Sequence, residues 1–219
     1  MTSRNVFGEI ILYKNLHRMR LWCNFVTERT FNQMDKRQSI LSTTLRLIVT
    51  QGIHATPMSQ IAKEAGVAAG TIYHYFPSKE ELLSELYGAL KREMGQALMT
   101  NIHASLPFKE MFHLFWNNLF NYYFHNPYEF EFLELCTYSP LISSEIKQAH
   151  IVHYSAVVDL LHHGIETGIL RSIPTDLLLT IVHGSVVTAV RFALAHPQSA
   201  QTITAEICLR SCWNSVVNI

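Results

Sequence analysis

The chain has 219 residues, 48% of them apolar, which is enough to bury a sizeable core and excludes an intrinsically disordered chain. Its 17 basic and 17 acidic side chains give a formal net charge of zero. Four cysteines without a Cys-x-x-Cys pair exclude a zinc ribbon and a disulfide scaffold.

The charge is unevenly distributed along the chain. Residues 1–79 contain ten basic and four acidic side chains, an excess of six positive charges, and the remainder carries an equal negative excess. A basic end on an acidic body is typical of a nucleic-acid-binding region joined to a region that does not bind nucleic acid. Chance segregation of the charges is the alternative.

Residues 1–33 are an extension without a clear amphipathic period. Glu9 interrupts their most apolar run, which is therefore too short and too charged for a signal peptide or a membrane span. Because Met34 begins a segment that looks like a natural start, we expect the extension to be disordered or to come from a misassigned start. The alternative is a basic arm that touches DNA, carried by Arg18, Arg20 and Arg29.

Three helices are expected between residues 36 and 76. The first runs to about residue 50, ends at Gly52, and has a buried stripe made of Ile40, Leu41, Thr44, Leu45 and Ile48. The second starts with Thr56 as its cap and Pro57 at its first position, and Gly66 suits its left-handed end. The third lies between Val67 and Pro77. A tight turn between two such short helices is typical of a helix-turn-helix.

The rest of the chain is expected to be helical. Ser78 and Glu81 form a capping box that opens a long helix reaching about residue 103. Further helices are predicted over 107–125, 143–168, 176–195 and 202–217. Residues 128–132 alternate like a strand, but a lone strand would have no partner, so we predict helix there too. The fold class is therefore all-α, with a three-helix DNA-binding domain at 34–81 and a larger helical domain at 82–219.

The segment 177–194 is apolar around nearly its whole circumference. Hydropathy alone would allow a membrane span. His183 and Gly184 in mid-segment, no basic flank and no second span argue against one, so no membrane partner is predicted. A helix that is apolar on all sides is also what the core of an oligomer requires.

The stretch from Thr56 to Leu82 resembles the DNA-binding end of the TetR/AcrR family of bacterial transcriptional repressors. The resemblance is carried by Thr56, Ile61-Ala62, Ala65-Gly66-Val67, Gly70 to Phe76 and Ser78 to Leu82. It covers roughly residues 36–85; beyond these it is architectural. The family commonly has Ser where Ala68 stands and Lys or Arg where Ala69 stands.

The resemblance implies a set of DNA contacts. Phosphate-touching positions of the family match Thr56, Thr71, Tyr73 and Lys79, and positions that face base edges match Ala68, Ala69, Gly70 and His74. Hydroxyls and an ammonium fix the register of a groove-entering helix, whereas the two alanines offer only methyl contacts. It also implies a homodimer through the last two helices, in which we place Val186, Val190, Leu194, Ile207, Leu209 and Trp213.

Aromatic side chains crowd residues 108–138, beside three glutamates. Most belong to a core, but such a cluster would also line a cavity for flat or cationic molecules. The body also looks like that of family members that sense drugs. The residues predicted to bind a ligand are Trp116, Phe120, Tyr123, Phe132 and Tyr154.

No catalytic motif and no complete metal-ligand set is present, so an enzyme, a cofactor and a metal site are not expected. His150 and His153 share one helix face without a third ligand. The sequence predicts a cytoplasmic, dimeric repressor of a pseudo-palindromic double-stranded DNA operator, released by a small aromatic or lipophilic effector that is cationic in one version. Two alternatives remain: a lipid- or fatty-acid-responsive regulator of the same fold, and a small-molecule-binding protein with a vestigial DNA-binding motif.

Overall fold

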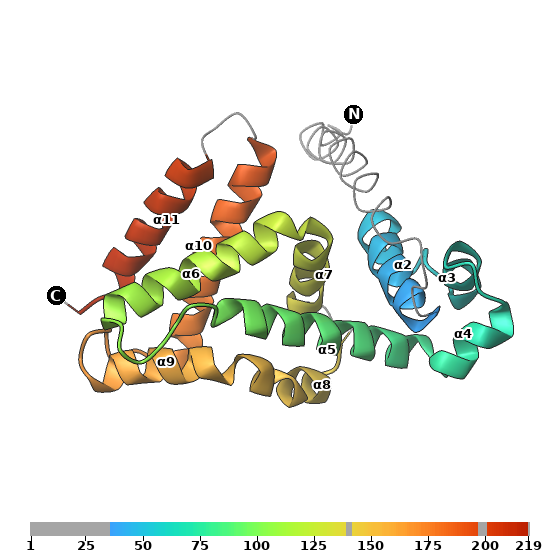
Figure 1. Ribbon diagram of the computed structural model, residues 1–219, viewed down its shortest axis with the longest axis horizontal. Helices are drawn as coiled ribbons and strands as arrows, with labels where there is room; N and C mark the ends of the chain where they lie inside the picture. The colour runs from blue at the N-terminus through green and yellow to red at the C-terminus, as the bar shows by residue number, and fades with distance from the viewer. Residues whose placement is uncertain (1–35, 139–141, 197–200, 219) are drawn as a thin grey trace, which may run out of the picture.

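A computed structural model of the protein describes residues 36–138, 142–196 and 201–218. The extension 1–33 lies outside them. Within these ranges the chain is helical without a named strand, which confirms the all-α prediction; Leu170 and Val217 form an isolated bridge. The molecule divides into a small head and a larger body, joined by one long helix (Figure 1).

The head consists of α2 (Lys36–Gln51), α3 (Met58–Glu64) and α4 (Ala69–Tyr75). One apolar face of each helix is buried, and the predicted stripe of α2 lies in this core. The largest fully buried side chains of the head are Phe76, Ile40, Ile48, Ile61 and Ile72, and Leu82 from the helix that follows joins them. This small core holds α4 against α3 and α3 against α2, and it leaves the opposite face of α4 free.

The turn between α3 and α4 follows the predicted glycine ending. Gly66 has a φ of 71°, the left-handed region that glycine tolerates best. The Ser39 hydroxyl donates to the Ala65 carbonyl at 3.1 Å and ties this turn to α2. The predicted start of α3 was wrong by one residue: Pro57 occupies the cap position, and the Thr56 hydroxyl bonds elsewhere.

The connecting helix α5 spans Lys79–Leu98. Its start is the predicted capping box, because the Ser78 hydroxyl accepts the Glu81 amide at 3.1 Å. Its end comes five residues before the predicted one. The side-chain amide of Asn118 donates to the Leu98 carbonyl at 3.0 Å and to the Thr100 carbonyl at 2.8 Å, which satisfies carbonyls at the helix end. The predicted domain boundary at residues 81 and 82 falls inside this continuous helix.

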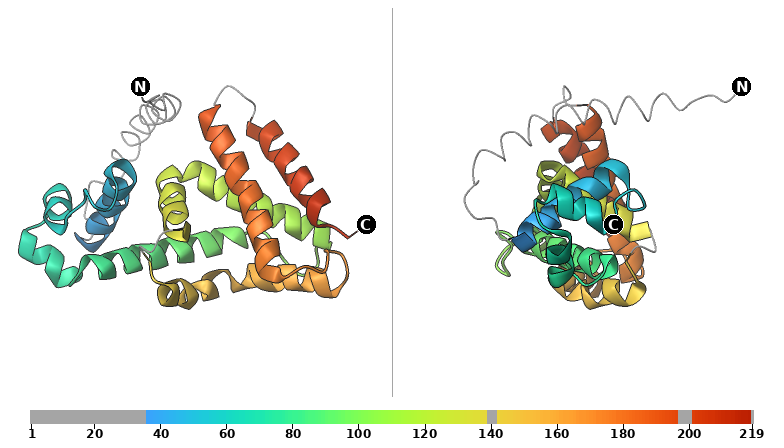
Figure 2. Two further views of the ribbon diagram at one scale, coloured as in Figure 1. Left: turned by 180° about the vertical axis from the view of Figure 1, so that it is seen from behind. Right: turned by 90° about the vertical axis from the view of Figure 1, so that its right-hand side faces the viewer.

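The body packs around α6 (Phe108–His125), which contacts α5, α7, α9, α10 and α11. The strand-like stretch after Asn126 is indeed helical and forms α7 (Pro127–Tyr138). The remaining long helices are α9 (Ser155–Glu166), α10 (Thr175–Ala195) and α11 (Gln201–Val216). Helices α10 and α11 lie side by side at the end of the molecule away from the head (Figures 1 and 2).

The single helix predicted over 143–168 is wrong. The chain forms α8 (Ser144–Ala149), a 3-10 turn η1 (Ile151–Tyr154) and then α9. The cause is a close crossing of η1 over α5. A Cβ added at Gly95 would lie 1.8 Å from the carbonyl oxygen of His153, so only glycine on α5 allows this approach.

Head and body touch at more than the connecting helix. Helix α7 packs against α2, and an ion pair joins Arg37 of α2 to Glu85 of α5. The guanidinium of Arg37 also lies 5.6 Å from the centroid of the Phe76 ring, at the end of α4. Both α5 and α7 of the body are therefore in contact with the head.

Candidate nucleic-acid interface and effector region

Helix α4 presents an exposed face of the kind that enters a DNA groove. Ile72 is fully buried and anchors the helix, whereas the residues on the other side are exposed: Ala68, Ala69, Gly70, Tyr73 and His74. A Cβ added at Gly70 would meet no atom within 4 Å, so another molecule can approach the backbone closely at this point. Five of the predicted contact residues therefore share one accessible surface.

The aromatic residues of α4 divide into two groups. Tyr73 is 52% exposed and available to a partner. Tyr75 is half-buried and packs on the head core, with its ring edge-on to that of His74 at 5.6 Å. Of these three rings, Tyr73 and His74 are the ones that DNA can reach.

The residues predicted to contact DNA phosphates are not equally accessible to DNA. Thr71 is half-buried at the start of α4. Thr56 is fully buried, and its hydroxyl donates to the Gly52 carbonyl at 2.7 Å and accepts from the Gln51 amide at 3.3 Å. Its hydroxyl thus holds the loop after α2 rather than facing outward, which the sequence could not reveal.

Lys79, at the start of α5, is tied to the same loop. Its ammonium donates to the Ile53 carbonyl at 2.5 Å, and burial lowers the pKa of this amine. An ammonium has three donors, so two remain for a phosphate. Lys79 is thus positioned by a contact inside the head before it meets any partner.

The head is basic in its described part. Residues 36–79 hold five basic side chains and one acidic one, Glu64. Glu64 accepts from Arg46 at 2.6 Å, and this exposed pair connects α3 to α2. Helix α4 itself has no acidic residue, so its exposed face does not repel phosphates.

The five predicted ligand residues lie in the body, mostly deep in its core. Trp116, Phe120, Tyr123 and Phe132 are at most 5% exposed, and Tyr154 is half-buried. The rings of Trp116 and Phe120 stack at 5.8 Å. Trp116, Phe120, Tyr123 and Phe132 are therefore packed core side chains in this structure. The sequence pattern predicted this of most of the aromatic cluster.

Polar groups are enclosed among these aromatic rings. The Tyr123 hydroxyl lies 3.1 Å from Nε2 of His183, and this nitrogen lies 3.6 Å from the Glu134 carboxylate. Burial lowers the pKa of His183 to about 4 and raises the pKa of Glu134. The Trp116 indole N–H donates to the Ser185 hydroxyl at 2.8 Å. The apolar helix α10 thus supplies two partly buried polar side chains, His183 and Ser185, that meet polar groups of α6.

Lys91 is the group in this region that sequence reasoning missed. It projects from the side of α5 that also carries Tyr87, Met94 and Leu98, all buried. Its ammonium lies 5.5 Å from the centroid of the Tyr87 ring and 5.2 Å from that of Tyr154. Burial lowers its pKa to about 8. Its place on an apolar helix stripe was the signal that would have identified it.

Comparison with known proteins decides the family. Residues 40–86 match the profile of bacterial regulatory proteins of the tetR family, and residues 87–218 match the profile of the tetracyclin repressor-like C-terminal domain. The chain belongs to the TetR family. The family is one of transcriptional regulators, with a helix-turn-helix head and a larger helical body.

The similarity extends over the whole fold in a solved structure. A tetR family transcription regulator from Shewanella sp. PV-4 has 30% sequence identity and a TM-score of 0.79; the match covers 85% of this chain and 100% of that one. An HTH-type transcriptional regulator of Haemophilus influenzae is 36% identical over 93 residues, which are 42% of this chain and 50% of that relative. The fatty acid metabolism regulator protein of Bacillus subtilis is 44% identical over 61 residues, 28% of this chain and 30% of the relative. These curated relatives are thus matched over half of their length or less.

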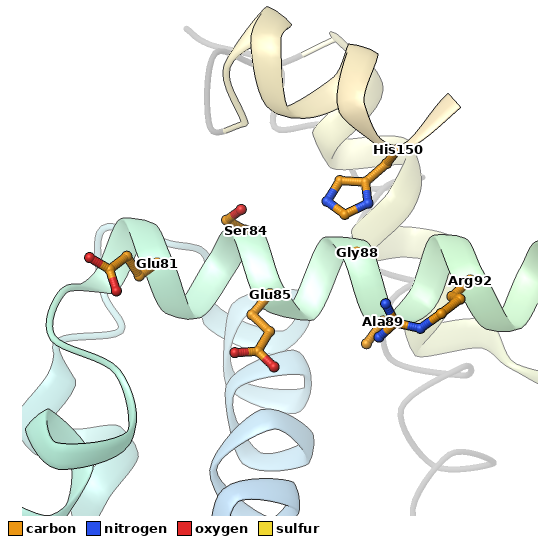
Figure 3. A pocket seen from close by; sticks show the side chains of 7 residues that line it. All are labelled: Glu81, Ser84, Glu85, Gly88, Ala89, Arg92 and His150. Carbon is orange, nitrogen blue, oxygen red and sulfur yellow. The ribbon is translucent and has the colours of Figure 1, made fainter. Parts of the chain in front are cut away.

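The pocket described for this TetR-family chain is a surface groove, separate from the five predicted ligand residues. Glu81, Ser84, Glu85, Gly88, Ala89, Arg92 and His150 line it (Figure 3). Figure 3 shows the His150 ring above Gly88, with Arg92 further along α5. Its lining is mostly polar and charged, which does not suit a lipophilic effector.

The histidines predicted to share a face are stacked. The rings of His150 and His153 are 5.4 Å apart, and Nδ1 of His150 is buried without a hydrogen-bond partner. In the part of the chain that the structure describes, no three His, Cys, Asp or Glu side chains gather as a metal site would require.

By length and composition, helix α10 could cross a membrane. Of the residues in its apolar 18-residue stretch, 33% are buried inside the structure. Length and composition are weak evidence, because the core helix of a water-soluble protein passes the same test.

Proposed function

We propose that this protein is a dimeric transcriptional repressor that binds a pseudo-palindromic operator and releases it when a small molecule binds to the body. The observation that carries this proposal is the exposed, acid-free face of α4 on a basic head. An exposed recognition helix of this kind lies in the DNA major groove. Like other members of its family, it would act in the cytoplasm.

The contacts divide by chemistry. Tyr73, Thr71 and Lys79 offer hydroxyl and ammonium donors to phosphates, which position the head without reading sequence. His74 reads a base edge, and Gly70 lets the backbone come close to one. Ala68 and Ala69 offer methyl groups to thymine. Thr56 contributes through the loop that it holds.

The dimer forms on the exposed face of α10 together with α11. Along α10 this face carries Leu177, Ile181, Gly184, Thr188 and Phe192, all exposed. Spacings of three and four residues put them on one stripe, to which Ile207 of α11 adds a further exposed apolar side chain. At Gly184 an added Cβ would meet nothing within 4 Å, which leaves room for a second helix.

This face differs from the residues first expected to pair. Val186, Val190, Leu209 and Trp213 are buried within one chain, and Leu194 is half-buried. They hold α10 and α11 against α6 and each other. The all-round apolar character of α10 thus serves two purposes, with one side facing the core and the other open to a second copy.

Effector binding is coupled to DNA through α5 and through the contact of α7 with α2. A ligand among α5, α6 and α7 would change the tilt of α5 and the separation of the two recognition helices, which must lie about one helical turn, ~34 Å, apart on DNA. The ligand has to favour the non-binding state, with a coupling free energy of typically ~1–3 kcal/mol.

The lipid-responsive alternative rests on two observations. One is the similarity of the head to the fatty acid metabolism regulator protein of Bacillus subtilis. That match covers less than a third of this chain and gives no account of the body. The other is Lys91, a half-buried cation of α5 beside the rings of Tyr87 and Tyr154.

A gel shift with the DNA upstream of the protein's own gene tests the proposed function. We expect a discrete complex whose affinity falls steeply with salt, because phosphate contacts release counterions. A protein with a vestigial motif would show only weak binding that is equal for unrelated DNA of the same length. Light scattering at the same concentration reports whether the bound species is a dimer.

A further inference from the structure

The segment that carries α8 and η1, residues 143–156, has no buried side chain of its own. It lies between Ile142 and Val157, which are both 2% exposed, and every residue between them is half-buried or exposed. A segment that buries so little apolar surface depends on a few specific contacts for its position, and such segments open most easily. We call residues 143–156 the strap.

The strap lies on α5 at two glycines. Gly88 and Gly95 are seven residues apart, which puts them on one side of the helix. A Cβ added at Gly88 would lie within 3.2 Å of three atoms of the His150 ring, and one added at Gly95 would meet the His153 carbonyl oxygen. Figure 3 shows the His150 ring above Gly88. Both histidines therefore rest directly against the helix, where a side chain on α5 would hold them away.

The His150 ring lies in surroundings that suit a neutral imidazole. Its Nδ1 is buried without a hydrogen-bond partner. The ring meets that of Tyr87 edge-on at 5.7 Å and stacks on that of His153 at 5.4 Å. A neutral ring with its proton on Nε2 leaves Nδ1 as an acceptor, whereas a protonated ring carries a donor on both nitrogens. Protonation would thus place a buried N–H where the described structure offers no acceptor.

The positive charges around this ring also oppose its protonation. Burial lowers the pKa of His150, and His153 of η1 with Arg92 and Lys91 of α5 lower it further. Arg92 lines the same surface groove as His150. A proton on His150 would therefore add a like charge beside two permanent cations.

The acidic groups of the same region have other positions or partners. Glu85 of α5 is paired with Arg37, and Figure 3 shows it projecting from the other side of the helix, with Glu81 nearer the head. On α8, Glu145 accepts from the Ser144 hydroxyl. Within the described residues no ion pair joins a carboxylate to the His150 ring.

We propose that the strap is a pH-sensitive clamp on α5, which stays docked while His150 is neutral and is released when His150 takes up a proton. In the released strap, water accepts from both ring nitrogens, and the two cations of α5 are farther away. Release uncovers the side of α5 that carries Gly88 and Gly95, and α5 is the helix that joins the body to the head. This device requires neither an effector nor DNA.

The direction of the pH dependence follows from the two states of His150. The released ring titrates near the ordinary histidine value of about 6.5. The docked ring has a lower pKa. Below about pH 6.5 the released strap therefore binds a proton that the docked strap does not, so docking is complete above this pH and weakens as the pH falls. One proton changes the opening equilibrium by at most about tenfold per pH unit.

Hydrogen exchange measured by mass spectrometry on the full-length protein tests the clamp. The amides of Lys147, His150 and His153 form hydrogen bonds inside the strap or to its first residue, and they report its docking. After correction for the intrinsic rate, their protection should fall at least about threefold between pH ~7.5 and pH ~5.5. The amides of α6, in the core of the body, should keep their protection over the same range.

Two variants assign the effect to His150. His150→Phe keeps an aromatic ring against Tyr87 and His153 but cannot take up a proton, so protection of the strap should no longer depend on pH. His150→Gln is a smaller side chain without a titrating group and should behave in the same way if the Phe ring does not fit. His153→Gln is the matched control on the same segment and should retain the pH dependence.

A second measurement does not depend on opening. Nuclear magnetic resonance of the imidazole carbons, with the His150 signal assigned by its loss in His150→Phe, should give His150 a pKa below about 6.5. Gly88→Ala adds the Cβ that displaces the ring, so it should return this pKa toward the ordinary value. It should also lower protection of the strap at neutral pH, although alanine favours a helix more than glycine does.

Four results would overturn the proposal. Protection of the strap that is independent of pH in the wild type would show that no clamp titrates. A fall in protection that persists in both His150→Phe and His150→Gln, or one that disappears only in His153→Gln, would assign the proton to another group. An ordinary pKa for His150 in the wild type would show that docking does not oppose its charge. DNA binding can be intact in all four cases, so these results leave the proposed function standing.

Discussion

His74 and Lys79 should affect DNA binding in different ways, because His74 is exposed on α4 whereas Lys79 is bonded to the Ile53 carbonyl. His74→Ala should change the preference at particular base pairs by roughly 1–3 kcal/mol. Lys79→Ala should weaken binding to all DNA sequences about equally. Titration of the operator and its single-base variants separates these effects, and a uniform loss in His74→Ala would contradict the base-reading role.

Lys91 should leave a signature in the pH dependence of stability. Its folded pKa of about 8 lies below its ordinary value of 10.5. Between these values the unfolded chain binds a proton that the folded chain does not, so the contribution of Lys91 to the free energy of unfolding rises with pH. Its unfavourable contribution is complete below pH 8 and disappears above pH 10.5.

Melting of the wild type and of Lys91→Met across this window measures the effect. The variant should be the more stable of the two below pH 8, and the difference should shrink as the pH rises. Glu134, Cys136 and His183 face the same interior, and comparison with the variant largely cancels their own titration. A difference independent of pH would mean that the surroundings of Lys91 do not oppose its charge.

At the scale of elements, the crossing of η1 over α5 depends on Gly95. Because an added Cβ would lie 1.8 Å from the His153 carbonyl oxygen, Gly95→Ala must push the two segments apart. We expect a loss of about 1–3 kcal/mol in the free energy of unfolding, as for other overpacked sites. Gly70→Ala is the control, since its Cβ would meet nothing within 4 Å. Urea unfolding of both variants tests this, and equal stabilities would contradict a close crossing.

The elements themselves were largely predictable from the sequence. Strong local signals marked the head: Gly66 ends α3, the Ser78 capping box starts α5, and a periodic apolar stripe follows α2. The break before α9 was not predictable, because it depends on η1 meeting Gly95 in space. The role of Thr56 was hidden for the same reason, since burial by neighbouring elements decides it.

At the scale of the whole molecule, two sides of α10 should respond differently to a charge. Ile181→Glu and Phe192→Glu put a charge on the exposed face, where it would be buried without a partner in the dimer. We expect folded monomers with weakened operator binding. Val190→Glu is the contrast, because Val190 is 0% exposed within one chain and its replacement should unfold the body. Light scattering and circular dichroism distinguish these outcomes, and an intact dimer in both exposed-face variants would exclude this interface.

Selection of bound duplexes from a random DNA pool tests the central claim most directly. At low salt, full-length protein should enrich a pseudo-palindrome whose half-sites lie about one helical turn, ~10 base pairs, apart or a multiple of it, because two recognition helices of a symmetric dimer enter major grooves on one side of the duplex. His74→Ala should select the same spacing between half-sites, but with weaker base preferences within each half-site. Enrichment of no palindrome under these conditions would contradict the account of this protein as a dimeric DNA-binding regulator.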